Sequence, residues 1–217
     1  MVSSSAFRLT NSGATAAALR DAQARRVRVP THRVGALKKH WKALIEPLTA
    51  HLKLAVKFDP KSLQILLLPA ALLAASADDA AFARETALAE GEAHCAKAVE
   101  YLNAFLAGFA VQDCVAILRL RDIYLQSFKV TDVKNLKRDH LKRAIARIVG
   151  TKGRTKNSIQ HSTKTRLLIA DKTIHLLGSH ENIALARDSI CSLILGAEPS
   201  KVHTHLSVVN RIMKEKI

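Results

Sequence analysis

The stretch that decides the fold is Ile145-Ala-Arg-Ile-Val-Gly-Thr-Lys-Gly-Arg-Thr-Lys156. Apolar residues recur at three- and four-residue spacing from Leu141 to Ile148, which predicts an amphipathic helix that ends at Gly150. A second short helix, which carries Ile159, is expected directly after Gly153. Because glycine has no Cβ, a loop of this kind turns sharply between two helices and lets a bulky ligand approach its backbone. The sequence therefore predicts a helix, a glycine loop and a second helix in direct succession.

Elements of the same kinds are predicted on both sides of this loop. The second half of the chain shows a strand within 124–133, two strands at 167–170 and 173–177 around Asp171-Lys172, and a helix over 183–195 that Gly196 ends. The first half shows a helix over 37–52 despite Pro47, a hairpin across 59–62, and a helix over 95–106 that ends at Gly108. The closing helices match at a constant offset of 88 residues, with Ala98, Leu102, Phe105, Leu106 and Gly108 opposite Ala186, Ile190, Leu193, Ile194 and Gly196. Two α+β repeats are therefore expected.

The repeats and the glycine loop together indicate an α+β protein with two tandem K-homology (KH) domains of type I, in the order β-α-α-β-β-α. The first repeat is expected to be degenerate, because it has no G-x-x-G between Leu52 and Leu54 or elsewhere. The expected divisions are a mobile polar N-terminal segment at 1–26, a degenerate KH-like domain at 27–118, a KH domain with the loop at 119–199, and a basic C-terminal tail at 200–217.

The charge of the chain is large and unevenly distributed. Its 217 residues include 34 Lys and Arg against 18 Asp and Glu, a formal net charge of +16, and the 48% of apolar residues exclude a disordered polycation. Between Lys129 and Arg166, twelve basic residues stand against two acidic ones, which places +10 within 38 residues. A charge run is often only a solvated helix face, but this one encloses the glycine pair. A polyanionic partner at the loop is therefore the favoured interpretation.

These features assign RNA-binding residues to the loop and to the helices that flank it. The free N–H groups and the positive dipole end of the second helix face the loop, and a KH loop of this kind clamps about four nucleotides. The expected RNA-binding residues are Gly150, Thr151, Lys152, Gly153, Arg154, Thr155, Lys156, Arg147, Arg143 and Lys142. The expected partner is single-stranded RNA, and no catalytic residue, cofactor or metal is expected.

Longer strings extend the similarity beyond the loop. They are Gly108-Phe109-x-Val111-x-Asp113, Ser127-Phe128-x-Val130-Thr131-Asp132-Val133-Lys134, Asp139-His140-Leu141-x-Arg143-Ala144-Ile145, Gly150-x-x-Gly153-x-Thr155-Lys156, His175-x-Leu177-Gly178-Ser179 and Leu195-Gly196-x-x-Pro199-Ser200-Lys201-Val202. On these strings the sequence resembles the partner-of-Nob (Pno/Dim) family of small-subunit ribosome assembly factors. The resemblance begins at Arg28-Val29-Pro30 and covers about four-fifths of the chain.

The resemblance implies a non-enzymatic protein that binds precursor ribosomal RNA near the 3′ end of the small-subunit RNA. It also implies contact with the Nob endonuclease that makes the final cut there, and with other pre-small-subunit assembly factors and ribosomal proteins. The implied location is the nucleolus and nucleus, with cytoplasmic pre-small-subunit particles. In that family the second repeat keeps the glycine loop and the first has lost it. The first repeat is then a platform for protein or for RNA shape.

Two features depart from the patterns being compared. Lys156 stands where a generic KH loop has an aliphatic residue, which agrees with the partner-of-Nob family but exchanges groove hydrophobicity for phosphate contact. The Ala-rich insertion at 72–87 is unlike the family, so the resemblance implies nothing there.

Other classes of function fit the sequence less well. A P-loop is excluded because G-x-x-x-x-G-K-[ST] is absent and a helix precedes the glycines. His203 and His205 lack a nearby cysteine or carboxylate cluster, which favours a solvated tail or an RNA contact over a metal site. Trp41 and Phe105 lie at helical spacing and are expected in the core. The apolar stretch 63–77 is shorter than a membrane span, and no membrane partner is expected. A KH regulator of messenger RNA and a basic protein-interaction scaffold remain as alternatives.

Overall fold

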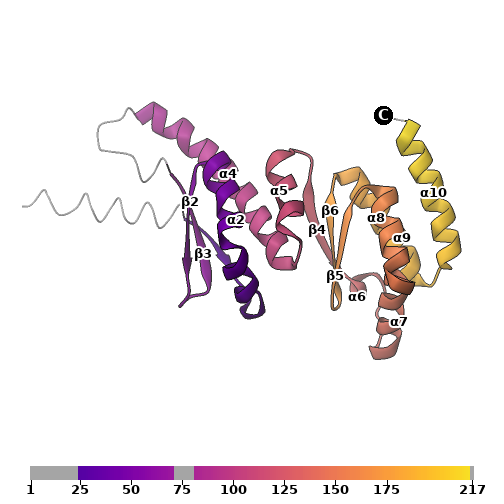
Figure 1. The fold of residues 1–217 in the computed structure, drawn as a ribbon. Helices are drawn as coiled ribbons and strands as arrows, with labels where there is room; N and C mark the ends of the chain where they lie inside the picture. Colours follow the sequence, from indigo (N-terminus) through magenta and orange to yellow (C-terminus); the bar gives the residue numbers. More distant parts are fainter. Residues whose placement is uncertain (1–23, 71–80, 216–217) are drawn as a thin grey trace, which may run out of the picture. The chain divides into compact units, whose positions relative to one another are not determined.

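The computed structural model describes residues 24–70 and 81–215, and its contacts divide the chain into two units, residues 1–106 and 107–217. Figure 1 shows the elements of both units along the chain. The expected mobile segment 1–26 lies outside the described residues up to residue 23, and the insertion 72–87 does so up to residue 80. The division after Leu106 comes before the boundary expected between residues 118 and 119.

Unit 1 is a three-stranded antiparallel sheet covered by two helices. Its elements are β1 (Arg25–Arg28), the 3₁₀ turn η1 (Thr31–Arg33), α2 (Val34–Leu52), β2 (Leu54–Asp59), β3 (Gln64–Pro69) and α4 (Ala81–Ala107). The strands pair in the order β1-β3-β2. Leu37, Leu44 and Leu48 of α2 are at most 1% exposed, and Ile65 and Leu67 of β3 are fully buried. The predicted apolar stripe of α2 therefore forms the core of this unit with the central strand.

Unit 2 repeats this arrangement and adds a helix at each end. Its elements are α5 (Val111–Arg119), β4 (Tyr124–Lys129), α6 (Val130–Val133), α7 (Arg138–Val149), the 3₁₀ turn η2 (Thr151–Gly153), α8 (Arg154–Thr163), β5 (Arg166–Ala170), β6 (Thr173–Gly178), α9 (His180–Leu195) and α10 (Pro199–Glu215). The strands pair antiparallel in the order β4-β6-β5. In both units, therefore, the third strand is central and the first and second strands form the two edges of the sheet.

The core of unit 2 lies between one face of its sheet and three helices. Phe128 of β4 and Ile174 of β6 belong to one buried cluster with Ile148 of α7, Ile159 of α8 and Ile190 of α9. Figure 1 shows α8 and α9 at this face, α10 beyond them, and α5 at the opposite face of the sheet. The α+β fold of two KH-type repeats that the sequence predicts is confirmed, including the first repeat without a glycine loop.

The strand expected within 124–133 is shorter than the apolar alternation suggests. It ends at Lys129, and the next four residues form the helix α6. The side chain of Asp132 accepts a hydrogen bond from the backbone N–H of Lys129 at 3.1 Å, so a local cap replaces the strand pairing.

The segment expected as a basic tail is the helix α10, which packs on α8 and α9. Val202, Leu206 and Val209 are buried, and their spacing of four and three residues places them on one face. His203 Nδ1 lies 3.1 Å from the hydroxyl of Ser158 on α8. The residues between these apolar positions are mostly polar, His203, Thr204, His205 and Ser207, so the helical pattern is weak in the sequence.

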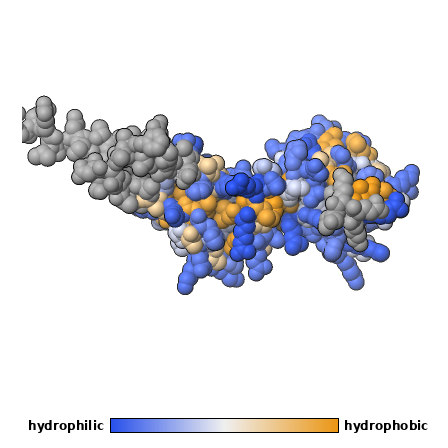
Figure 2. All heavy atoms as spheres, turned by 90° about the horizontal axis from the view of Figure 1, so that it is seen from above, coloured by the Kyte–Doolittle hydropathy of each residue, from blue (hydrophilic) through white to orange (hydrophobic). Residues whose placement is uncertain are grey.

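Polar side chains make up much of the molecular surface. Hydrophilic residues project from the face shown in Figure 2, with hydrophobic residues between them. Leu120 and Leu195 are more than half exposed, at 54% and 60%. Within residues 24–70 and 81–215, no helix combines the length and the apolar character that a membrane crossing needs.

Candidate nucleic-acid interface

The glycine loop begins at Gly150, where only a glycine fits. The backbone there has φ 71° and ψ 175°, a region that residues with a side chain essentially do not enter. A Cβ at this position would lie 2.8 Å from the backbone nitrogen of Thr155 and 2.9 Å from its Cβ. The helix α7 therefore stops here, and the chain turns back against the first residues of α8.

The second glycine is required for a different reason. Gly153 has φ 78°, but a Cβ there would meet nothing closer than Asn157 Nδ2 at 3.9 Å. The space beside Gly153 is therefore open to a ligand. Lys152, directly before it, also has a positive φ of 53°, which is strained for a residue with a side chain. Lys152 is therefore the residue of this turn whose backbone is strained, since glycine adopts a positive φ without steric cost.

The N-terminus of α8 lies at the glycine loop, where the N–H of its first residue, Arg154, donates to the carbonyl oxygen of Thr151. Gly153 is its N-cap, and no side chain caps the helix by a hydrogen bond. The first N–H groups of a helix have no partner within the helix, and the helix dipole adds positive potential at this end. A phosphate group is therefore the ligand that this end of α8 suits best.

A groove of ≈ 520 Å³ lies along this loop. It is lined by Arg143, Ala146, Arg147, Gly150, Thr151, Arg154, Thr155 and Pro199. The three arginines are exposed, and within the described part of the chain none of them forms an ion pair with a carboxylate. Guanidinium groups without a counter-charge around a glycine loop favour a negatively charged strand in the groove.

The structure brings together most, but not all, of the residues that the sequence proposes for RNA binding. Lys142, Lys152, Gly153 and Lys156 do not line the groove, although Lys142 and Lys152 are exposed beside it. Thr155 lines the groove but is only 5% exposed, and it packs against Gly150. Its place therefore indicates that it shapes the loop. Pro199, the first residue of α10, was not predicted as a groove residue, because the helix that begins there was not predicted.

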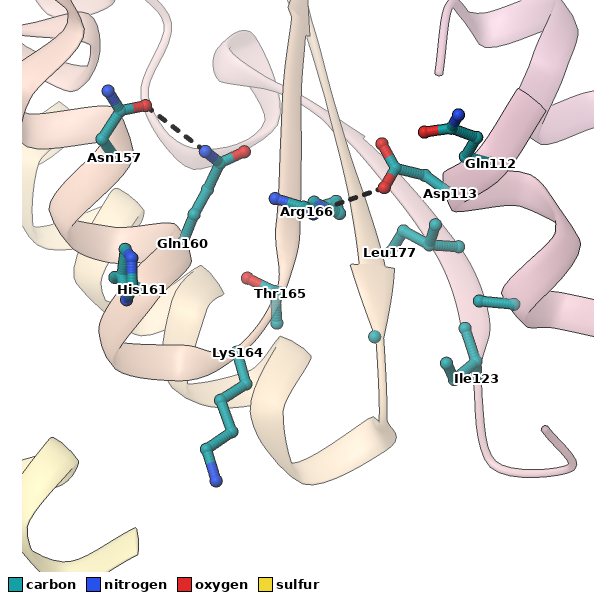
Figure 3. Close-up of a pocket in the computed structure, with 12 residues that line it drawn as sticks. Gln112, Asp113, Ile123, Asn157, Gln160, His161, Lys164, Thr165, Arg166 and Leu177 are labelled. Atoms are coloured by element: carbon teal, nitrogen blue, oxygen red, sulfur yellow. Dashed lines mark hydrogen bonds and ion pairs between the residues drawn. The ribbon is translucent and has the colours of Figure 1, made fainter. Parts of the chain in front are cut away.

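A second hollow, of ≈ 650 Å³, lies at the other end of α8 (Figure 3). Its lining includes Asn157, Gln160, His161 and Lys164, which recur at three- and four-residue spacing along α8. The amide of Gln160 is held at both ends, since its Nε2 donates to Asn157 Oδ1 at 3.4 Å and its Oε1 accepts from the backbone N–H of Leu167 at 2.9 Å. A polar row therefore leads along α8 from the glycine loop to this hollow.

The opposite wall of the second hollow comes from α5 and the sheet. Arg166 of β5 donates from Nε to Asp113 Oδ1 of α5 at 3.0 Å, and Figure 3 shows the two side chains pointing toward each other. Leu177 and Ile123 provide apolar surface beside them. Local sequence patterns did not predict this hollow. The spacing of Asn157, His161 and Lys164 was the available signal, but α5 was not predicted.

The outer face of the second sheet carries His175, with Lys129 and Arg166 in register on the same face. The side chains of Ser127 on β4 and His175 on β6 lie 2.6 Å apart, from Oγ to Nδ1. Burial lowers the pKa of His175 below its usual value. His175 thus lies on a strand face, where the neutral imidazole is favoured.

Trp41 and Phe105, both expected in the core, differ in the structure. Phe105 is 2% exposed, whereas Trp41 is only partly buried and lines a hollow of unit 1. Across residues 24–70 and 81–215 the structure contains no group of three His, Cys, Asp or Glu residues placed to hold a metal ion.

The fold and the loop define a class of protein: a tandem KH protein of type I, whose second repeat carries the glycine loop that grips unpaired nucleic acid in this fold. Residues 127–211 match the family model for the second domain of PNO1, described as a eukaryotic-type KH domain of type I.

Relatives of known name extend this match over most of the chain. The chain is 40% identical over 193 residues to the RNA-binding protein pno1 of Drosophila melanogaster. The matched region covers 89% of this chain and 74% of that protein. It is 38% identical over 195 residues to the pre-rRNA-processing protein pno1 of Schizosaccharomyces pombe, which covers 90% of this chain and 74% of that protein. The chain belongs to the Pno1 family, and the resemblance to the partner-of-Nob family is confirmed.

A solved structure supports the fold over both units. The chain is similar to a chain of the a/eIF2alpha-aDim2p-rRNA complex from Pyrococcus horikoshii OT3, with a TM-score of 0.64, 20% identity, and coverage of 87% of this chain and 94% of that chain. At this level of identity the likeness shows the fold.

Proposed function

We propose that this protein is a non-enzymatic assembly factor of the small ribosomal subunit that binds single-stranded precursor ribosomal RNA through unit 2. The observation that carries the proposal is the groove along Gly150, where Arg143, Arg147 and Arg154 are exposed beside the N-terminus of α8 and pair with no carboxylate among the described residues. The names of the fly and fission-yeast relatives, an RNA-binding protein and a pre-rRNA-processing protein, support the same function.

The proposed path of the RNA runs along α8. A phosphate lies at the N-terminus of α8, next to the open space at Gly153. The following nucleotides run along the polar row that begins with Asn157 and reach the second hollow, where Lys164 presents hydrogen-bond donors. Lys142, Lys152 and Lys156 add charge around the loop but do not line the groove, so we assign them to phosphates outside it.

The finer parts of the proposal rest on family membership. The RNA is the region near the 3′ end of the small-subunit RNA, and the partners are the Nob endonuclease, other pre-small-subunit assembly factors and ribosomal proteins. The protein acts in the nucleolus and nucleus and remains with cytoplasmic pre-small-subunit particles. The expected domain divisions belong to the same proposal, with α5 and α10 joined to the loop-bearing repeat.

The test of RNA binding is the double variant Thr151→Asp/Lys152→Asp of the full chain. Two carboxylates at the loop repel phosphate, so binding to an unstructured RNA of about twelve nucleotides is lost in fluorescence anisotropy at physiological salt. Arg121→Asp is the control, since it reverses an exposed cation between α5 and β4, away from the loop. Unchanged affinity of the double variant, with a native circular dichroism spectrum, contradicts the proposal.

The test of the RNA class is crosslinking in cells. Reads that cluster near the 3′ end of the small-subunit precursor support an assembly factor. Reads that map to mature messenger RNA support a KH regulator instead, and the absence of crosslinked RNA supports a protein-interaction scaffold.

A further inference from the structure

Unit 1 contains a hollow of ≈ 600 Å³ between α2 and the edge strand β2. It is lined by Leu37, Lys38, Trp41, Val56, Lys57, Phe58 and Pro60. Pockets of this size accommodate small organic groups such as one nucleotide. Unit 2 has an equivalent position. There the edge strand β5 follows α8, as β2 follows α2 in unit 1, and the two sheets have the same strand order.

Two aromatic rings form one wall of this hollow. The ring centroids of Trp41 and Phe58 are 5.8 Å apart with an interplanar angle of 56°. Trp41 lies at helical spacing from the buried Leu37, Leu44 and Leu48, yet it remains partly exposed because the hollow opens at its position. Phe58 is also partly exposed. Core packing therefore does not account for all of the aromatic surface at this position.

The charge around the hollow is positive. Lys38 and Lys57 line it and are exposed, and residues 34–69 contain six lysines against two carboxylates, a net charge of +4. One of those carboxylates, Asp59, is engaged within the hairpin turn, where it accepts hydrogen bonds from the Ser62 hydroxyl at 2.8 Å and the Lys61 N–H at 3.0 Å. An anionic ligand with a flat apolar part suits these walls best, and an RNA nucleotide has both features.

We propose that this hollow holds an unpaired base of single-stranded RNA stacked on Trp41, with the flanking phosphates beside Lys38 and Lys57. The proposal rests on the function proposed above, that the chain binds RNA, and gives unit 1 a direct part in it. Stacking on an aromatic side chain tolerates any base, since every base has a π face. Unit 1 thus binds RNA without a glycine loop, by aromatic surface and lysine charge.

The sequence provides a built-in probe for this site, because Trp41 is the single tryptophan among the 217 residues. Titration of the full chain with an unstructured RNA of about twelve nucleotides quenches the tryptophan emission in a saturable way if a base stacks on the indole. Anisotropy of the same RNA, labelled at one end, measures binding to the whole chain in parallel. The two readings separate this proposal from the function on which it rests.

The variant that tests the charge contribution is Lys38→Glu/Lys57→Glu. Both side chains are exposed, so the fold is retained, and the quenching is lost or requires about tenfold more RNA. The matched control is Lys39→Glu/Lys42→Glu, which makes the same charge change with exposed residues of α2 that do not line the hollow. Trp41→Ala lowers the affinity in anisotropy by about tenfold, and Trp41→Phe restores most of it.

Each outcome decides the proposal. RNA binding in anisotropy without any change in tryptophan emission overturns the base site in unit 1 and leaves RNA binding by unit 2 standing. An equal loss of quenching in both lysine variants also overturns it, because the effect is then general to charge. Absence of RNA binding in both measurements contradicts the proposed function itself. If RNA leaves the emission unchanged while a peptide strand from a partner protein alters it, the hollow is a protein-docking site.

Discussion

The strands of the two units pair in the same order, but the helical segment between the first and the second strand differs. In unit 1 this segment is α2, one helix over Val34–Leu52, which continues through Pro47. In unit 2 it is divided into α7 and α8 by the turn Thr151–Gly153. The fold therefore does not need the glycine loop. Non-glycine residues with positive φ occur in both units, at Lys53 and Leu63 as well as at Lys152. The glycine-only conformation of Gly150 occurs where the loop lines an anion-binding groove, which points to function.

The largest effect is expected from Gly150→Ala, which removes the feature that separates the units. The new Cβ meets the backbone of Thr155, and the backbone conformation is one that alanine avoids. We expect a loss of about 3 kcal/mol in the free energy of unfolding of unit 2, measured by urea denaturation, together with loss of RNA binding.

Gly153→Ala distinguishes a glycine that RNA binding needs from a glycine that the fold needs. Its Cβ points into open space and its left-handed backbone is accessible to alanine at about 1–2 kcal/mol. The fold is retained while RNA affinity falls at least tenfold, because the methyl group occupies the place of the sugar-phosphate backbone. Equal loss of stability in both glycine variants would contradict this assignment of the two positions.

The arginines of the groove are expected to act through phosphate contacts. Arg143→Ala and Arg154→Ala each weaken RNA binding by about fivefold near physiological salt and reduce the slope of log Kd against log salt by about 0.7. Anisotropy titrations at several salt concentrations measure both quantities. A loss of affinity with an unchanged slope means that these arginines do not contact phosphates.

The polar row of α8 is expected to contribute only with longer RNA. For Asn157→Ala/Lys164→Ala, we expect unchanged affinity for a tetranucleotide and about threefold lower affinity for an RNA of about twelve nucleotides. The reason is that these residues line the second hollow and not the groove at the loop. Equal losses for both lengths would place the RNA elsewhere on α8.

Gly35→Ala tests whether the uninterrupted helix of unit 1 requires its glycine. Gly35 lies in the first turn of α2 with nothing within 4 Å of the position of a Cβ, so alanine is expected to stabilise unit 1 by about 0.5–1 kcal/mol. Thermal unfolding measures this change. A destabilising effect would show that the uninterrupted helix of unit 1 requires its glycine.

The smallest effect concerns pH. Because the folded-state pKa of His175 is lowered, folding disfavours its protonated form, and its neutral form contributes stability above the unfolded pKa of about 6.5. That contribution is lost as the pH falls from 6.5 toward the folded-state pKa. His175→Gln should therefore reduce the drop in Tm between pH 7 and pH 5, measured by thermal unfolding at both pH values, and an unchanged drop would contradict this role of His175.

Local patterns predicted the parts of this fold that depend on a few neighbouring residues. The apolar spacing of α2, α7 and α9, both hairpin turns and the stop at Gly150 are of this kind. The helices α5 and α10 were missed because packing stabilises them. Cys114 and Ile117 of α5 are buried, but their spacing within nine residues is too short a signal.

The candidate site shows the same limit. The loop and its arginines are adjacent in sequence, so the groove at Gly150 was proposed from spacing. The walls that come from distant segments, such as Pro199 at the groove and Asp113 beside Arg166, require the tertiary structure. The exposure of a side chain was also not predictable from the sequence. Helical spacing alone assigned Trp41 to the core, although it is partly exposed.

The most direct test of the account is ultraviolet crosslinking of the full chain to an unstructured RNA, with the crosslinked residues identified by mass spectrometry. The account predicts crosslinks within 150–156 in unit 2, lost in the Thr151→Asp/Lys152→Asp variant, and a separate crosslink at Trp41. Crosslinks confined to α5 or the outer face of the second sheet, with none at the loop, would contradict it.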